Sequence, residues 1–191
     1  MEDLIIKGRS GTNWEKANME GLQELLVEEL QDLYSAERQV LQALPGIITA
    51  AQSEELKAAL ADHLDATTVH LKRLEDAFAV AGEQPAGKHC SGMEGLLAEG
   101  RECIESREPS PLRDLAIISA MQRVALYEVA AYGSACARAD NCDLPSCTGL
   151  LRETLIEEEA MDQLLTEVSE HIIELSEHTF QEDDVITPSA P

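Results

Sequence analysis

The chain has 191 residues, of which 44% are hydrophobic and only 3% aromatic, and it carries 37 acidic against 14 basic side chains. The formal net charge of −23 argues against nucleic-acid and anionic-membrane partners, because such a surface repels phosphate groups. A composition rich in Leu and Ala and poor in aromatic residues is typical of helices, and the length suffices for one domain with a substantial core.

The sequence also indicates where the protein works. It opens with no hydrophobic leader, and no apolar run approaches the roughly 20 residues that cross a bilayer, so we expect a cytoplasmic protein without a membrane partner. The five cysteines lack CxxC spacing and any zinc pattern, which predicts reduced thiols. A regulatory disulfide among Cys136, Cys142 and Cys147 is the alternative, because these three lie close together in the sequence.

The N-terminal part is predicted to contain an arm and one long helix. Residues 1–18 have no sustained periodicity, so we expect a flexible arm there. The helix runs from about Met19 to Ala51, and Pro45 is expected to kink it or divide it in two. One acid, Glu37, interrupts its inward stripe. The apolar members of that stripe are Leu22, Leu26, Leu30, Leu33, Val40, Leu44, Ile47 and Ala51.

The second helix carries two histidines on its inward stripe. It is predicted to begin after the N-cap Ser53 and to end before Gly82. His63 and His70 are two turns apart on the same face, with Thr67 between them.

A long connection, residues 82–110, separates the second helix from the third and exceeds the length of a simple hairpin. Ser91 and Glu94 fit a capping box, which predicts a short helix ending near Ser106. Ser110-Pro111 predicts the start of the third long helix, with Ser110 as the N-cap.

The third long helix, Pro111–Ala139, has one strongly polar residue on its predicted inward face, Gln122. Glu128 is predicted at the edge of that face, more than about 90° from its centre. The other residues predicted to point inward are Leu115, Ile118, Ser119, Leu126, Val129, Gly133 and Cys136.

The fourth helix follows a turn at residues 140–145 and continues to about His178. Two acids, Glu158 and Asp162, interrupt its apolar stripe one turn apart. The tail, residues 179–191, is polar and predicted to be disordered. The apolar residues of the stripe are Leu151, Leu155, Leu165, Ile172 and Leu175.

This order of elements predicts an all-α fold. Two helical pairs with short turns, joined by one long connection, are the arrangement of a ferritin-like four-helix bundle. We therefore expect residues 19–178 to form that bundle, with a short extra helix in the crossover.

Five polar residues fall near the middle of their helices on inward faces. A buried carboxylate is unfavourable unless a partner or a metal balances its charge. Carboxylate and imidazole groups suit iron, manganese or zinc, and a carboxylate-rich set favours the harder ions, so we predict a core site for one or two ions of iron or manganese. The predicted ligands are Glu37, His63, His70, Glu158 and Asp162, and the polar residues expected around them are Thr67, Gln122 and Glu128. The same groups also fit a metal-free network of hydrogen bonds, which would need a protonated acid or an imidazolium.

Residues 32–39 (DLYSAERQ), followed by Ala43-Leu44-Pro45, resemble the YciF/YciE family of stress-associated ferritin-like proteins. The resemblance covers about residues 20–175. It implies a bundle that is often dimeric, with a di-metal centre and peroxide or oxidase chemistry, and Glu37, His63, Thr67, Glu158 and Asp162 match that centre by position. Further matching segments, in order, are His63-Leu64, Arg73-Leu74, Cys90, Met93–Leu96, Arg113-Asp114, Tyr127-Glu128, Ala131–Gly133 and Leu155–Asp162.

The chain departs from the family pattern at several inward positions. The third helix of the family reads Glu-His-Tyr-Glu where this chain has Ala125-Leu126-Tyr127-Glu128. An acid is common at the position of Ala66, and Gln is frequent at the position of His70. One ion, a weakened pair and an empty polar core therefore all remain open.

Two hypotheses follow. In the first, the protein is a cytoplasmic, homodimeric stress protein whose metal site handles a small oxidant, peroxide or dioxygen, as an oxidase or a catalase-like enzyme. In the alternative, the bundle is metal-free or degenerate and acts as a non-enzymatic structural or partner-binding dimer, a role that Ala125 and Leu126 favour.

Overall fold

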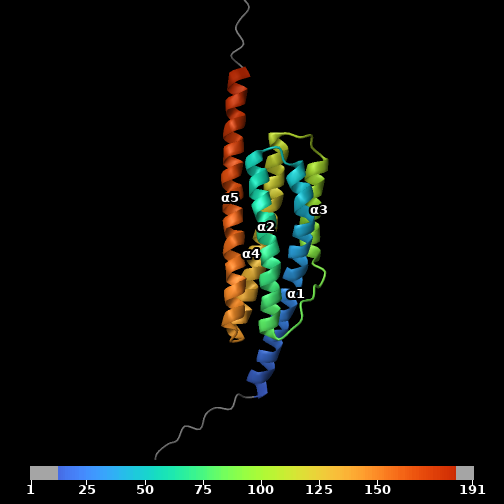
Figure 1. Cartoon of the computed structure of the whole chain (residues 1–191), viewed down its shortest axis with the longest axis vertical. Helices are drawn as coiled ribbons and strands as arrows, with labels where there is room; N and C mark the ends of the chain where they lie inside the picture. The colour runs from blue at the N-terminus through green and yellow to red at the C-terminus, as the bar shows by residue number, and fades with distance from the viewer. Residues whose placement is uncertain (1–12, 184–191) are drawn as a thin grey trace, which may run out of the picture.

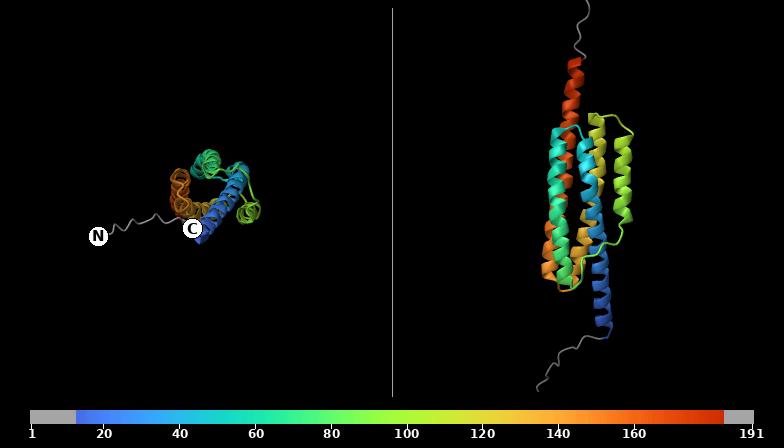
Figure 2. Two further views of the ribbon diagram at one scale, coloured as in Figure 1. Left: turned by 90° about the horizontal axis from the view of Figure 1, so that it is seen from below. Right: turned by 45° about the vertical axis from the view of Figure 1, so that its right-hand side comes forward.

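The structure is a computed structural model that describes the backbone of residues 13–183 and the side chains of residues 18–176. Four long helices run side by side as a bundle, and a shorter fifth helix packs on its outside (Figures 1 and 2). The predicted all-α ferritin-like bundle is confirmed, and the described residues contain no strand. The helices are α1 (Asn13–Ala50), α2 (Glu54–Ala81), α3 (Ser91–Glu105), α4 (Pro111–Asn141) and α5 (Pro145–Asp183).

The first helix is longer than predicted and is not divided. It begins at Asn13, so residues 13–18 of the expected arm are helical, whereas residues 1–12 lie outside the described part of the chain. It also continues through Pro45. Pro45 lies on the exposed side, where water can satisfy the carbonyl that loses its N–H partner. Of the two outcomes expected at Pro45, the division into two helices is therefore wrong, and the kink stays a prediction.

The turn between α1 and α2 is fixed to α4. The predicted caps of α2 are confirmed, because Ser53 accepts a hydrogen bond from the Leu56 N–H and Gly82 adopts a left-handed φ of 79°. The buried carboxylate of Asp114 accepts hydrogen bonds from the N–H of Gln52 at 2.9 Å and of Ser53 at 2.7 Å. This carboxylate therefore holds the chain reversal against the first turn of α4.

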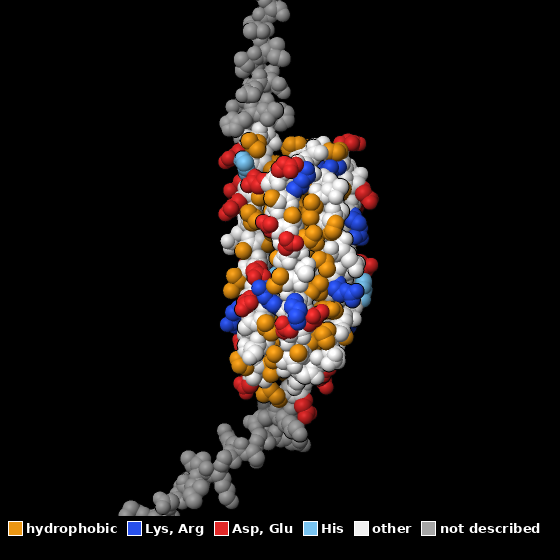
Figure 3. All heavy atoms as spheres, viewed as in Figure 1, with side chains coloured by type: hydrophobic (Ala, Val, Ile, Leu, Met, Phe, Trp, Pro, Cys, Tyr) orange, Lys and Arg blue, Asp and Glu red, His pale blue; other side chains and the backbone are white. Residues whose placement is uncertain are grey.

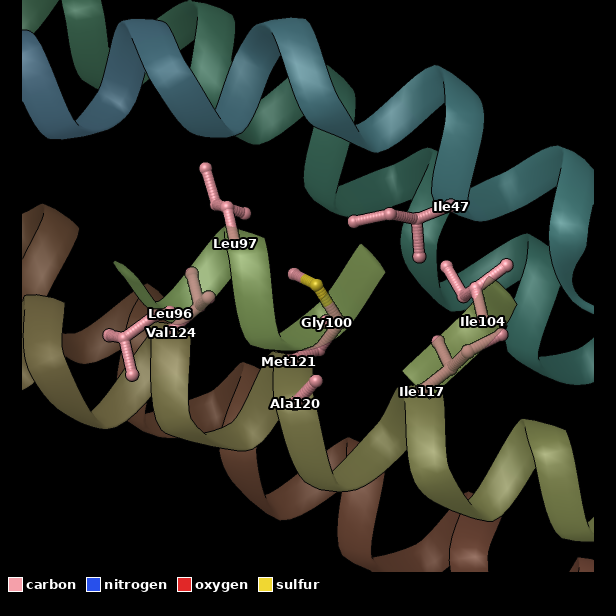
Figure 4. Close-up of a pocket in the computed structure, with 9 residues that line it drawn as sticks. All are labelled: Ile47, Leu96, Leu97, Gly100, Ile104, Ile117, Ala120, Met121 and Val124. Atoms are coloured by element: carbon pink, nitrogen blue, oxygen red, sulfur yellow. The ribbon is translucent and has the colours of Figure 1, made fainter. Parts of the chain in front are cut away.

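The crossover helix α3 starts differently from the prediction. Its N-cap is Cys90 and not Ser91, because the buried thiol of Cys90 accepts from the Met93 N–H and also contacts the hydroxyl of Tyr127 at 3.0 Å. Glu94 pairs instead with His89 at 3.0 Å. Between α3, α1 and α4 lies a small pocket (Figure 4) whose wall is apolar. The residues lining it are Ile47, Leu96, Leu97, Gly100, Ile104, Ile117, Ala120, Met121 and Val124.

The register of α4 also differs from the prediction. Ile118 and Cys136 are buried as expected, but Leu126 is 52% exposed and Ser119 faces solvent. The buried face combines five alanines with larger side chains such as Ile117, Met121 and Tyr132. Its alanines are Ala120, Ala125, Ala131, Ala135 and Ala139, and Leu115, Gln122, Val129 and Gly133 are only partly buried.

The last helix extends past the end of the bundle (Figure 1). It continues beyond the predicted end at His178 to Asp183, and residues 184–191 of the predicted tail lie outside the described chain. Leu175, predicted to point inward, is 55% exposed.

The structure also bears on the predictions about the cysteines and about membrane-spanning segments. All five cysteines are free in the structure, so no disulfide joins Cys136, Cys142 and Cys147. Within the part of the chain that is described, no helix has both the length and the apolar composition of a membrane span.

Candidate metal centre

A polar layer lies in the middle of the bundle between two apolar clusters. In α1, Glu37 lies between Leu33 of one cluster and Val40 of the other. In α4, Glu128 likewise lies between Val124 and Ala131. The same alternation in α2 and α5 places polar side chains at one level of all four long helices. The five ionisable members, all at most 4% exposed, are Glu37, His63, His70, Glu128 and Glu158.

These five side chains form two overlapping groups that could each hold a cation. The first consists of Glu37, His70 and Glu158, and the second of His63, Glu128 and Glu158. In each group the potential ligand atoms lie within 4.8 Å of one another. Glu158 belongs to both groups, so its carboxylate could bridge two ions.

His70 lies at the centre of the first group. Its Nδ1 is 3.3 Å from Oε1 of Glu37 and 3.3 Å from Oε1 of Glu158. On the opposite side of the ring, Nε2 is 2.9 Å from Oε2 of Glu157. His63 is placed more loosely, with its Nδ1 3.9 Å from Oε1 of Glu158.

Many polar atoms of the layer have no hydrogen-bond partner among the described residues. The hydroxyl of Tyr132 donates to Oε1 of Glu37 at 2.6 Å, but the other oxygen of Glu37 has no donor. Buried polar groups are rarely left unpaired in this way, and a cluster of carboxylate oxygens and imidazole nitrogens suits a cation. The unpartnered atoms are Oε2 of Glu37, Nε2 of His63, Nδ1 of His70 and both carboxylate oxygens of Glu128 and Glu158.

Burial also changes the protonation of these groups. Burial and the neighbouring charge of Glu37 raise the pKa of Glu158 to about 8, and burial with the charges of Glu37 and Glu158 raises the pKa of Glu128 well above its usual range. Burial lowers the pKa of His63 to about 4. For His70, burial favours the neutral ring, but the Glu37 and Glu158 carboxylates outweigh this effect and raise its pKa. The layer therefore needs positive charge, from protons or from metal ions.

Four of the five predicted ligands meet in this layer, and the fifth does not. Asp162 is half-buried and belongs to neither group. Glu128, predicted at the edge of the inward face of its helix, is instead fully buried and belongs to the second group, so that placement was wrong. Thr67 is buried but its hydroxyl donates to the His63 carbonyl, and Gln122 donates to Thr166 near the surface.

The two departures from the family pattern in α4, Ala125 and Leu126, differ in whether they affect the core. Leu126 is 52% exposed, so a histidine at this position would not point into the layer. Ala125 is 1% exposed, and its methyl group does occupy the core. Three residues that contact this layer or support it were not predicted: Tyr132, Glu157 and Arg73, whose guanidinium donates to Oε1 of Glu157 at 2.8 Å. Arg73 lies one turn after His70, so the sequence alone places the two side chains on the same side of their helix. Its partner Glu157 belongs to a run of three acids, and the sequence does not distinguish it from its neighbours.

Comparison with known proteins identifies relatives over most of the chain. The family described as "Domain of unknown function (DUF892)" matches residues 21–177. Protein YciF of Escherichia coli (strain K12) is 35% identical over 153 residues, which cover 80% of this chain and 92% of YciF.

Solved structures agree with this match. The crystal structure of the E. coli stress protein YciF has a TM-score of 0.78 at 34% identity and covers 80% of this chain and 97% of its own. YcfI from Rhodopseudomonas palustris has a TM-score of 0.74 at 32% identity, covering 76% and 92%. A two-domain protein from Anabaena variabilis that contains a ferritin-like domain has a TM-score of 0.53 at 17% identity, covering 97% of this chain and 45% of its own, and this likeness supports the fold alone.

Proposed function

Because this chain belongs to the DUF892 family, we propose that it is a YciF-like, ferritin-like stress protein that holds one or two ions of iron or manganese in its core. One observation carries the proposal. Five ionisable side chains from the four long helices meet in a buried layer. Each of the five has at least one carboxylate oxygen or imidazole nitrogen without a hydrogen-bond partner among the described residues. A cation would satisfy these atoms and balance the carboxylate charges.

The five residues would provide two ion positions. Glu37 and His70 would hold one ion, His63 and Glu128 a second, and Glu158 would bridge them. Iron or manganese bound there would supply redox chemistry toward a small oxidant, peroxide or dioxygen. Tyr132 fixes one oxygen of Glu37, and the apolar clusters on either side exclude bulk water from the layer.

Metal analysis tests this proposal directly. The protein is purified without chelator, loaded with Fe²⁺ or Mn²⁺ under exclusion of oxygen, desalted and analysed for bound metal. We expect one or two equivalents in the wild type and in the control Glu159→Gln, whose side chain is exposed, and a large loss in Glu158→Gln. Equal, substoichiometric metal in all three proteins would refute the site. Peroxide consumption by the loaded wild type then tests the oxidant chemistry.

The metal-free alternative predicts a different result. If the bundle is a structural or partner-binding protein, Glu158→Leu should be neutral or stabilising, because it replaces a buried carboxyl group whose oxygens have no hydrogen-bond partner with an apolar side chain. Glu37→Ala should then destabilise the protein, because the buried hydroxyl of Tyr132 loses its acceptor. Under our proposal both variants lose metal. The homodimer implied by the resemblance stays a prediction, and light scattering coupled to size-exclusion chromatography would test it.

A further inference from the structure

We propose that Arg73 and Glu157 form a positioning pair that holds the ring of His70 with its Nε2 protonated, so that Nδ1 is presented to a cation bound by Glu37 and Glu158. The inference rests on the proposed metal site and adds to it two residues outside the ligand groups. It also assigns a role to Glu157, whose neighbour Glu158 points into the layer while Glu157 does not.

The ring of His70 connects the buried layer with the surface. The side chain of His70 is fully buried, whereas that of Glu157 is 42% exposed. Nε2 of His70 lies 2.9 Å from Oε2 of Glu157, which is hydrogen-bond distance. Nδ1 faces the other way, toward the carboxylates of Glu37 and Glu158. Each ring nitrogen therefore has a separate environment.

Arg73 holds Glu157 in this position from the other side. Its guanidinium contacts both carboxylate oxygens, with Nη1 at 2.5 Å from Oε2 and Nη2 at 2.8 Å from Oε1. The same guanidinium reaches Oγ1 of Thr154 at 3.3 Å and Oε2 of Glu153 at 3.3 Å. A bidentate arginine–carboxylate pair is geometrically specific, so Glu157 is directed toward His70 and away from the ion-binding groups.

The chemistry of imidazole turns this geometry into a role. A neutral ring has one N–H, and a carboxylate at Nε2 requires the proton to be there, which leaves the lone pair on Nδ1. Nδ1 is one of the unpartnered atoms of the layer. Without Glu157, the proton could move to Nδ1, donate to Glu37 or Glu158 and block a cation. Acceptors behind a ligating histidine are known to fix its tautomer and strengthen its binding.

His63 provides an internal contrast. Its Nε2 has no hydrogen-bond partner among the described residues, so the structure offers it no comparable acceptor. The effect of the pair should therefore be confined to the ion position that His70 serves.

Binding measurements with matched variants test the inference. Mn²⁺ affinity is measured by calorimetry for the wild type, Glu157→Ala, Glu157→Gln and the control Glu153→Ala. Glu153 also contacts Arg73 and carries the same charge on the same helix, but it does not touch His70. We expect Glu157→Ala to weaken the binding about 10- to 100-fold. Glu157→Gln should lose less, because its amide oxygen can still accept the Nε2 proton, and Glu153→Ala should resemble the wild type. Equal affinities for Glu157→Ala and Glu153→Ala would overturn the inference.

A second readout does not depend on metal. Nitrogen NMR of the metal-free protein, at alkaline pH where the ring is neutral, reports which nitrogen of His70 carries the proton. We expect Nε2 in the wild type and in Glu153→Ala, and a shift toward Nδ1 in Glu157→Ala. A proton on Nδ1 in the wild type would refute the positioning role even if metal binds. Conversely, a wild type that binds no metal but keeps its proton on Nε2 would refute the proposed function and leave the positioning of the ring intact.

Discussion

Glu158 links the stability of the metal-free protein to pH. Its pKa in the folded protein is about 8, against an ordinary value of 4.5, so the folded state holds a proton that the unfolded state has released. A raised pKa contributes stability at low pH, and this contribution is lost as the pH rises toward 8. Glu128 and His70, whose pKa values are also raised, act in the same direction. His63 acts in the opposite direction, but only below about pH 6.5.

The window between pH 6.5 and 8 therefore isolates the raised groups. In the presence of a chelator, we expect the free energy of unfolding to fall across this window by about 1.4 kcal/mol per pH unit for each proton retained on folding. Urea denaturation at several pH values measures this slope. The Glu158→Gln variant, which cannot ionise, should have a smaller slope. A wild-type slope of zero, or one that the variant shares in full, would contradict this assignment.

Differences between the helices explain why most of the site, but not all of it, could be predicted from the sequence. In α1, α2 and α5 leucines and other large apolar residues mark the buried stripe, so the polar interruptions Glu37, His63, His70 and Glu158 were recognisable. In α4 the buried face beside Glu128 alternates larger residues with alanines such as Ala125 and Ala131, and Leu126 lies outside it. A stripe drawn through Leu126 and Val129 is rotated away from the true face. Glu128 was misplaced for that reason.

Asp162, which was predicted to point inward, is only half-buried, and the reason is related. It lies one turn from Glu158, but α5 buries Met161 and Leu165 and leaves Asp162 at the edge of the interface. Periodicity resolves the direction of a side chain only to within tens of degrees. The partners of a buried group are less predictable still. The contact between Glu157 and His70 depends on how α2 and α5 pack, which no single helix encodes.

The start of α3 depends on the close approach of Gly92 to Tyr127. A Cβ at Gly92 would lie 2.9 Å from the Tyr127 ring, whose hydroxyl donates to Asp32 at 2.7 Å. We expect Gly92→Ala to destabilise the protein by about 1–3 kcal/mol, because the ring is held and must shift. Gly95→Ala in the same helix meets no atom within 4 Å and should stabilise by about 0.5–1 kcal/mol. Urea denaturation of both variants checks this, and a Gly92→Ala protein as stable as Gly95→Ala would contradict it.

At the scale of the whole molecule, acidic side chains outnumber basic ones by 37 to 14. Acidic side chains are spread along the visible face, interspersed with basic and apolar ones (Figure 3). Because the net charge is −23, the acidic side chains of the folded protein repel one another. Any divalent cation relieves part of that repulsion by screening. A stabilising effect of metal ions is therefore not sufficient evidence for a core site. The effect has to depend on the chemistry of the ion and on the buried ligands.

Thermal unfolding can separate these two contributions. An ion that binds only the folded state at 100 times its Kd adds about 2.7 kcal/mol to the free energy of unfolding, which corresponds to about 5–10 °C in Tm for a chain of this size. We expect Mn²⁺ to produce this increase in the wild type and Mg²⁺ at equal concentration to produce less, because Mg²⁺ gives up its water ligands reluctantly and avoids imidazole. In Glu158→Leu the two ions should act alike, since the shared ligand is gone and only surface screening remains. If Mn²⁺ raised the Tm of this variant as much as that of the wild type, the stabilisation would arise at the surface and the buried layer would not be its origin.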